Sequence, residues 1–349
     1  MIANLPRILG TIALASAGTA VFVLLGLPLP FLFGPLVACL LAALAGAPVA
    51  GPGKIGTLMR TVLGVAIGAS ITPELIERLP QMVFSLALVP VYVVVIAMIG
   101  VPFFRRVYGL DPPTAFFAAM PGGLQEMTAF GEESGAKVRT LTLIHATRLL
   151  VIVLVAPLIM IVAFGADLDN PIGAPAVTLP FHEMLIMVGA AIIGWRAAAK
   201  IGVFGAAIIG PMILAAALSL GDVIHSRPPA EAILAAQFFI GIGLGAGYVG
   251  VTFSELRRDV AAGLVYVVIV AALAAMFAEL VILTALAPPI DGFLAFAPAG
   301  QAEMAILAIV VGADLGFVVL HHVARVFFIL TCAPLAARLL GFASQKEQE

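Results

Sequence analysis

The chain has 349 residues, of which 63% are hydrophobic and only 10% are charged, and its mean hydropathy is +1.20. A soluble domain carries about 25% charged residues, so this composition excludes a soluble protein and indicates one embedded in a lipid bilayer. The formal net charge of −2 decides little, because in membrane proteins the distribution of charge matters more than its sum. Cys39 and Cys332 both fall in apolar runs, which excludes a disulfide framework and a zinc site.

Breaks at Pro, Gly and charge clusters divide the chain into twelve apolar segments. The first continues past a signal-peptide-like Ala15-Ser16-Ala17 to Leu27, and more apolar segments follow at once, so we interpret it as a transmembrane helix. The predicted segments are 8–27, 31–47, 55–72, 80–102, 113–131, 140–165, 183–199, 202–220, 230–249, 259–286, 292–310 and 315–341.

The second half of the chain repeats the first. FFAAMPGGLQEM, from Phe116, aligns with FLAFAPAGQAEM, from Phe293, at an offset of 177 residues. The ungapped alignment holds 15 identities in 44 positions from Ala115 to Leu158, and they include Pro, Glu, His and Arg. Chance similarity between apolar stretches would match Leu, Ala and Val instead. We therefore predict a duplication, with a first membrane repeat over 1–172 and a second over 181–343.

The distribution of Lys and Arg indicates how the two repeats are oriented. If all twelve segments cross the membrane, the loops hold seven basic residues on each side. If segments 113–131 and 292–310 instead enter and return on the same side, twelve lie on the cytoplasmic side and only Arg78 and Arg227 outside. The positive-inside rule favours the second arrangement. The predicted fold is an all-α polytopic membrane protein with two inverted repeats, each of five transmembrane helices plus one re-entrant helical hairpin, and with both termini cytoplasmic.

Each re-entrant segment is interrupted near its middle, by Pro121-Gly122-Gly123 or by Pro298-Ala299-Gly300. Proline removes a backbone donor and glycine allows a tight reversal. Discontinuous segments at matching positions in inverted halves indicate the central site of a transporter. The candidate binding residues at these breaks are Gly122, Gly123, Gln125, Glu126, Gly300, Gln301 and Glu303.

The next segment of each repeat carries a His and an Arg three residues apart, which places both on one helix face. These residues are His145 and Arg148, then His322 and Arg325. A charge inside the membrane needs a partner or a watery cavity, and Glu126 and Glu303 are the expected partners. Two interpretations stay open: each Glu–Arg pair only pins the hairpin to its neighbouring helix, or the set binds a substrate or coupling ion. Glu279 has no counterpart in the first repeat and is a candidate proton carrier.

The doubled P-x-G-x-x-E-M block, followed by G-A and then H-x-x-R, resembles the membrane AbrB family, also called the AbrB duplication family. That family is distinct from the small DNA-binding regulator with the same name. Its members are described in three ways: as ammonia monooxygenases, as membrane regulators and as transporters. The resemblance implies the duplication and a bacterial inner membrane. Two departures, Ala299 for the middle Gly and the displaced Gln301, indicate that the halves of the site are not equivalent.

The residues separate these three descriptions. An oxygenase needs clustered metal ligands, and the five His residues have no compact ligand spacing beyond one adjacent pair, so we expect no enzyme, metal or cofactor. A DNA-binding protein needs a basic soluble module, and none is present. The predicted function is a secondary-active inner-membrane transporter, of a small organic anion coupled to H⁺ or Na⁺. The alternative is a membrane sensor that regulates gene expression indirectly. The expected partners are the bilayer and the solute, and a homo-oligomer stays open.

Overall fold

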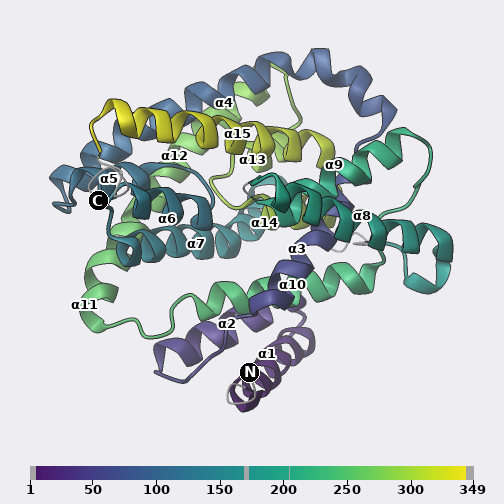
Figure 1. Cartoon of the computed structure of the whole chain (residues 1–349), viewed down its shortest axis with the longest axis horizontal. Helices are drawn as coiled ribbons and strands as arrows, with labels where there is room; N and C mark the ends of the chain where they lie inside the picture. Colours follow the sequence, from purple (N-terminus) through teal and green to yellow (C-terminus); the bar gives the residue numbers. More distant parts are fainter. Residues whose placement is uncertain (1–4, 169–172, 204, 343–349) are drawn as a thin grey trace. The chain divides into compact units, whose positions relative to one another are not determined.

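The computed structural model describes residues 5–168, 173–203 and 205–342, and every regular element in these ranges is helical. The side chain of Gln125, the basic residue Lys346 and the predicted repeat ends at 172 and 343 lie outside the described part. Figure 1 shows the elements along the chain. The first half contains α1 (Leu5–Leu24), α2 (Pro30–Leu44), α3 (Gly53–Gly68), α4 (Pro73–Arg106), α5 (Pro112–Ala119), α6 (Leu124–Glu133) and α7 (Val138–Phe164). The second contains α8 (Phe181–Lys200), α9 (Ala206–Leu220), α10 (Ala230–Ala246), α11 (Phe253–Glu255), η3 (Leu256–Val260), α12 (Ala261–Leu283), α13 (Pro289–Phe296), α14 (Gln301–Val311) and α15 (Leu315–Leu339), and a short turn η2 (Ala176–Thr178) precedes it.

Each predicted apolar segment coincides with helix, and both predicted interruptions are present. Segment 113–131 is split into α5 and α6, and segment 292–310 into α13 and α14. The breaks fall at Pro121 and Pro298, since a proline ring clashes with the preceding turn and supplies no N–H. The same order of long and broken helices therefore occurs twice along the chain.

Six spans in the described part are long and apolar enough to cross a membrane. They are α1, α4, α7, α8, the continuous α11–η3–α12 stretch and α15. Four further helices, α2, α3, α9 and α10, have 15–17 residues and so extend about 23–26 Å, somewhat less than a hydrocarbon core of about 30 Å. The chain is thus an all-helical protein with the helices of a multi-pass membrane protein.

The helices gather into two compact units, each built from both halves of the chain. Unit 1 holds α1–α3 and α8–α10, and unit 2 holds α5–α7, α11–α13 and most of α4 and α15. Each sequence repeat therefore contributes its first three helices to unit 1 and its later helices to unit 2. The predicted repeat boundaries describe the sequence and stay a prediction.

Unit 1 is packed through glycines that cross between the two halves of the chain. A Cβ on Gly64 or Gly68 of α3 would collide with main-chain carbonyls of α9, and one on Gly241 or Gly245 of α10 with carbonyls of α2. Such small residues let two helix backbones approach closely. Close packing, the sequence-based interpretation of these glycines, is confirmed, and it is reciprocal between the halves.

The first broken segment of unit 2 is a helical hairpin whose two ends meet. The Asp111 carboxylate accepts from the Thr114 N–H at the start of α5, and the Thr114 hydroxyl accepts from the N–H of Lys137, just beyond α6. Lys137 Nζ also lies 3.4 Å from the Asp111 carboxylate. Burial opposes ionisation of Asp111, but these hydrogen bonds and this charge lower its pKa. The chain therefore leaves the hairpin where it entered it.

The glycine contacts predict which helical glycines tolerate a methyl group. We expect Gly68→Ala and Gly245→Ala to destabilise the protein by about 1–3 kcal/mol, because the new Cβ meets rigid backbone. Thermal unfolding of the detergent-solubilised protein measures the effect. Gly189→Ala in α8 is the matched control: nothing lies within 4 Å of its Cβ, so stability should hold or rise. Equal melting temperatures for all three variants would contradict the close packing.

Candidate functional site

The tip of the first hairpin is held by side chains of α7. The break between α5 and α6 leaves main-chain carbonyls without helical partners, and apolar surroundings provide no water to replace them. His145 Nε2 contacts the Phe117 carbonyl at 3.1 Å. Arg148 donates Nη1–H to the Met120 carbonyl at 3.0 Å and Nη2–H to the Gly122 carbonyl. Both side chains are fully buried, at 0% and 1% exposure.

The second hairpin has the same set of contacts, shifted by 177 residues. His322 Nε2 contacts the Leu294 carbonyl at 2.9 Å. Arg325 donates Nη1–H to the Ala297 carbonyl at 2.8 Å and Nη2–H to the Ala299 carbonyl at 2.7 Å. The duplicated His-x-x-Arg pattern thus reflects one structural arrangement made twice: a histidine and an arginine that cap a broken helix. Cations are favoured there, because the carbonyl end of a helix carries partial negative charge.

These contacts fix the protonation of both site histidines. A carbonyl can only accept, so Nε2 carries the proton in His145 and in His322. Arg325 Nη2 lies 2.8 Å from His322 Nδ1, and a guanidinium can only donate, so that nitrogen is an acceptor. His322 is therefore neutral. His145 Nδ1, by contrast, is buried and has no hydrogen-bond partner.

Two tyrosines connect each hairpin to the opposite half of the chain. Tyr92 of α4 donates its hydroxyl to the Phe296 carbonyl at 2.9 Å, and Tyr266 of α12 donates to the Ala119 carbonyl. Phe296 and Ala119 are equivalent positions, each the last residue of its first half-helix. Both tyrosines are buried, at 1% exposure each. The two halves therefore exchange a hydrogen bond at the carbonyl that ends each half-helix.

The glutamates do not form the expected pairs with the arginines of their own repeats. Each carboxylate folds back over the glycine that precedes its helix, Glu126 over Gly123 and Glu303 over Gly300. Among the described residues, neither carboxylate forms an ion pair with Arg148 or Arg325 within 4.0 Å. Arg148 instead lies within electrostatic range of Glu303 and Arg325, both from the other repeat. A carboxylate at a helix N-terminus is favoured by the partial positive charge there.

Both arginines keep one donor free. Arg148 Nε and Arg325 Nε are buried and have no hydrogen-bond partner in the described part of the chain. A buried donor left unsatisfied costs about 1–3 kcal/mol, so a site that retains two of them is suited to an acceptor that comes and goes. The charge at this position, two guanidinium groups within electrostatic range, favours an anion as that acceptor.

The other predicted residues are placed as follows. Gly122 is buried, whereas Gly123, Glu126, Gly300 and Gln301 are half-buried. Glu303 is buried, at 8% exposure. Glu279 lies on an exposed face of α12, apart from the tip residues, and its role as a proton carrier stays a prediction. No group of three metal-ligating side chains occurs among the described residues, so a metal has no evident place there.

Sequence reasoning missed the two tyrosines. They are separated by 174 residues rather than 177, so the ungapped alignment does not pair them. The chain has only four tyrosines, and a tyrosine inside an apolar helix needs a partner for its hydroxyl, which is the signal that was available. His321 was also missed: its Nδ1 bonds the Phe317 carbonyl at 2.8 Å, and its buried Nε2 has no partner.

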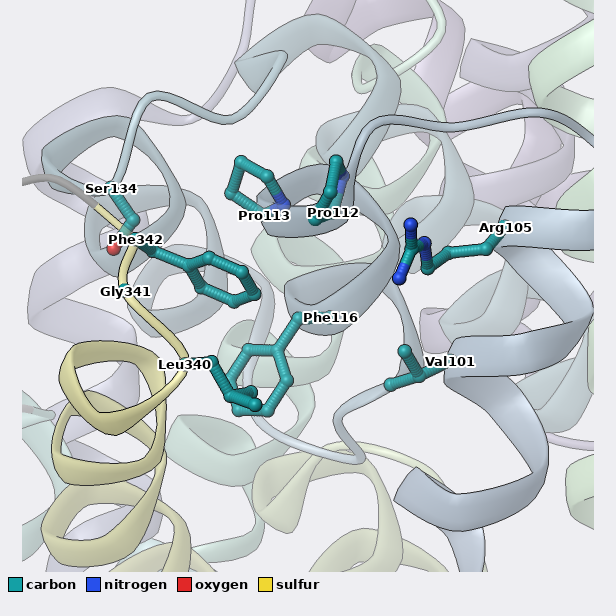
Figure 2. A pocket seen from close by; sticks show the side chains of 9 residues that line it. All are labelled: Val101, Arg105, Pro112, Pro113, Phe116, Ser134, Leu340, Gly341 and Phe342. Carbon is teal, nitrogen blue, oxygen red and sulfur yellow. The ribbon is translucent and has the colours of Figure 1, made fainter.

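Unit 2 also has an open hollow of about 520 Å³ away from these contacts. Figure 2 shows Arg105 reaching towards it from α4, opposite Phe116 and Phe342, whose rings meet edge to face. None of the hairpin-tip histidines, arginines or glutamates lines this hollow. Its walls are mainly apolar, so it lacks the convergent polar groups that distinguish the hairpin tips.

The exchanged hydrogen bonds make a direct prediction about stability. Tyr92→Phe and Tyr266→Phe should each cost about 1–3 kcal/mol, because each leaves a buried carbonyl without its donor while the ring still packs. Thermal unfolding of the purified variants measures this loss. Tyr108→Phe is the control, since Tyr108 is only half-buried and its hydroxyl has no recorded partner. Wild-type stability in both buried variants would show that the exchange contributes little.

Comparison with known proteins agrees with the motifs. The family described as transition state regulatory protein AbrB matches residues 31–341. The Bacillus subtilis (strain 168) protein named "Uncharacterized protein YhjN" is 29% identical over 97% of this chain and 94% of its own length. The Escherichia coli (strain K12) protein named "Putative regulator AbrB" is 23% identical over 93% of this chain and 94% of its own. No solved structure matches the chain. The match over residues 31–341 establishes that this all-helical chain belongs to the AbrB family.

Proposed function

We propose that the protein is a secondary-active transporter of the bacterial inner membrane that carries a small organic anion coupled to H⁺ or Na⁺. The observation that carries this proposal is the pair of equivalent broken-helix tips, each closed by a buried arginine. Discontinuous helices with charged residues at the break are typical of transporter binding sites. A protein that only anchored helices would gain nothing from burying two guanidinium groups, each of which costs free energy inside a membrane.

The charges at the tips favour an anionic substrate. Arg148 and Arg325 are fully charged side chains, and each keeps an unpartnered buried Nε–H. The second half-helices, α6 and α14, begin at the same breaks and add the partial positive charge of their N-termini. Glu126 and Glu303 already lie at these N-termini. An incoming carboxylate would compete with them, and such competition is a means of coupling substrate binding to cation binding.

We further propose that the two repeats are inverted in the membrane, with ten spans, two re-entrant hairpins and cytoplasmic termini. The contact between Asp111 and Lys137 supports re-entry of the first hairpin, since both ends of that segment lie together. The twelve-to-two distribution of basic residues supports the orientation.

A membrane sensor that regulates gene expression is the second candidate. It is favoured by the name of the Escherichia coli relative, "Putative regulator AbrB". Both candidates bind a small molecule, but only a transporter moves it across a bilayer. Purified protein in liposomes separates them, because a sensor would bind the solute without accumulating it.

The inverted arrangement predicts the side of the membrane on which two loops lie. Reporter fusions after residue 135 should show a cytoplasmic location, and fusions after residue 312 an external one. These positions are equivalent in the two repeats, so parallel repeats would place both on one side. A fusion after residue 106 is the control and should report cytoplasmic, because Arg105 and Arg106 precede it. The reverse result at residues 135 and 312 rules out this orientation of the repeats.

A thermal-shift screen tests the substrate class on the purified protein. We expect succinate or glutamate to raise the melting temperature, and ammonium to have no effect. Arg148→Ala and Arg325→Ala should weaken the stabilising carboxylate at least about tenfold, because a hydrogen bond to a charged group contributes about 1.5–3 kcal/mol.

Two controls keep the screen interpretable. Arg257→Ala removes an exposed arginine of η3 and should leave ligand stabilisation unchanged. Arg148→Lys keeps the charge and separates loss of charge from loss of folding. Stabilisation by ammonium together with none by any carboxylate would reject the anion proposal.

A further inference from the structure

We infer that the guanidinium groups of Arg148 and Arg325 take the place of a coupling sodium ion, so that the transporter uses protons carried by Glu126 and Glu303 and does not use Na⁺. This inference rests on the proposed transport function, and it chooses between the two coupling ions.

The place where a sodium ion would bind is already filled. In transporters with discontinuous helices, unwound carbonyls and the carbonyl ends of half-helices coordinate the coupling cation. Here those carbonyls accept hydrogen bonds from a guanidinium at each tip. Met120 and Gly122 bond Arg148, and Ala297 and Ala299 bond Arg325 at 2.7–2.8 Å.

The remaining carbonyls near the breaks are also engaged. Those of Phe117 and Leu294 bond the neutral site histidines. Those of Ala119 and Phe296 bond the exchanged tyrosines. Each tip therefore presents four carbonyls that have protein donors, and a sodium ion would have to displace several of these donors to collect its oxygen ligands.

Charge opposes sodium binding as well. Arginine stays protonated in proteins, so each tip carries a permanent positive charge within hydrogen-bonding distance of the carbonyls concerned. Arg148 and Arg325 are 1% and 3% exposed, and like charges repel strongly where water does not screen them. A second cation at either tip is therefore disfavoured.

The two carboxylates are then left to carry the coupling cation, as a proton. The charged and titratable groups around them are Arg148 and His145 on α7, Arg325, His322 and His321 on α15, Tyr92 on α4, Tyr266 on α12 and Asp291 on α13. Ionised Glu126 and Glu303 compete with an anionic substrate for the positive charge of the arginines and helix ends. A proton taken from the aqueous phase onto each carboxylate removes this competition, and it is released to water again after the substrate leaves. Proton and anion thus bind together, as linkage requires.

The first arm of the test measures sodium binding to the purified full chain. Binding of radioactive Na⁺, and melting temperatures in NaCl, KCl and choline chloride at equal ionic strength, should show no saturable site and no Na⁺-specific shift. Arg148→Ala and Arg325→Ala free the tip carbonyls, so a Na⁺-specific stabilisation should appear in these variants. Saturable Na⁺ binding to the wild type would overturn the inference.

The second arm measures the proton. The melting temperature of the wild type should depend on pH, and the Glu126→Gln/Glu303→Gln double variant should lose most of that dependence. The matched control, Glu132→Gln/Glu133→Gln, changes two exposed carboxylates at the end of α6 and should keep it. Identical pH profiles for all three proteins would overturn the assignment of the proton to these residues.

The outcomes also separate this inference from the proposed function. If the wild type binds Na⁺ while a carboxylate stabilises it, the transporter stands and the choice of coupling ion is wrong. If no solute moves into liposomes, the transport function itself fails, whatever the sodium result.

Discussion

Main-chain carbonyls that a broken helix leaves without partners are the constraint on which the rest of unit 2 depends. Each would cost about 1–3 kcal/mol if left unsatisfied where no water reaches it. A buried guanidinium is equally costly alone, but its planar fork offers several donors in fixed directions. At each tip the two problems resolve one another, since one arginine satisfies two carbonyls on either side of the proline. The break and the arginine therefore require each other, which explains why the duplication preserves both.

Exchange between the two halves of the chain is the second theme, and it occurs in both compact units. In unit 1 the glycines of α3 contact carbonyls of α9, and those of α10 contact carbonyls of α2. In unit 2 the tyrosines of α4 and α12 bond carbonyls of the opposite hairpin. Neither sequence repeat could bury its own packing surfaces or satisfy its own hairpin, which is the usual reason that a repeat unit does not fold alone. Two copies are thus the smallest set that completes the structure.

Much of this arrangement was predictable, because it depends on residues that are conspicuous in an apolar chain. Pro121 and Pro298 predicted the breaks, and the His-x-x-Arg pattern predicted which helix faces them. The partners of the arginines were not predictable. Opposite charge suggested Glu126 and Glu303, whereas the arginines bond carbonyls, which leave no trace in a sequence. Tyr92 and Tyr266 were hidden by a three-residue shift in spacing, since the connection between the long helix and the hairpin differs in length between the repeats.

The two tips share their hydrogen bonds but differ in their surroundings. Glu303 is buried while Glu126 is half-buried, and Arg325 contacts His322 Nδ1 while the equivalent nitrogen of His145 has no partner. In a symmetric binding protein such differences would be accidental. In the proposed inverted arrangement they are expected, because a transporter open to one side must hold its two repeats in different conformations and exchange these when it opens to the other. The half-buried Glu126 then marks the tip that exchanges protons with water in this state, and Glu303 the tip that is closed.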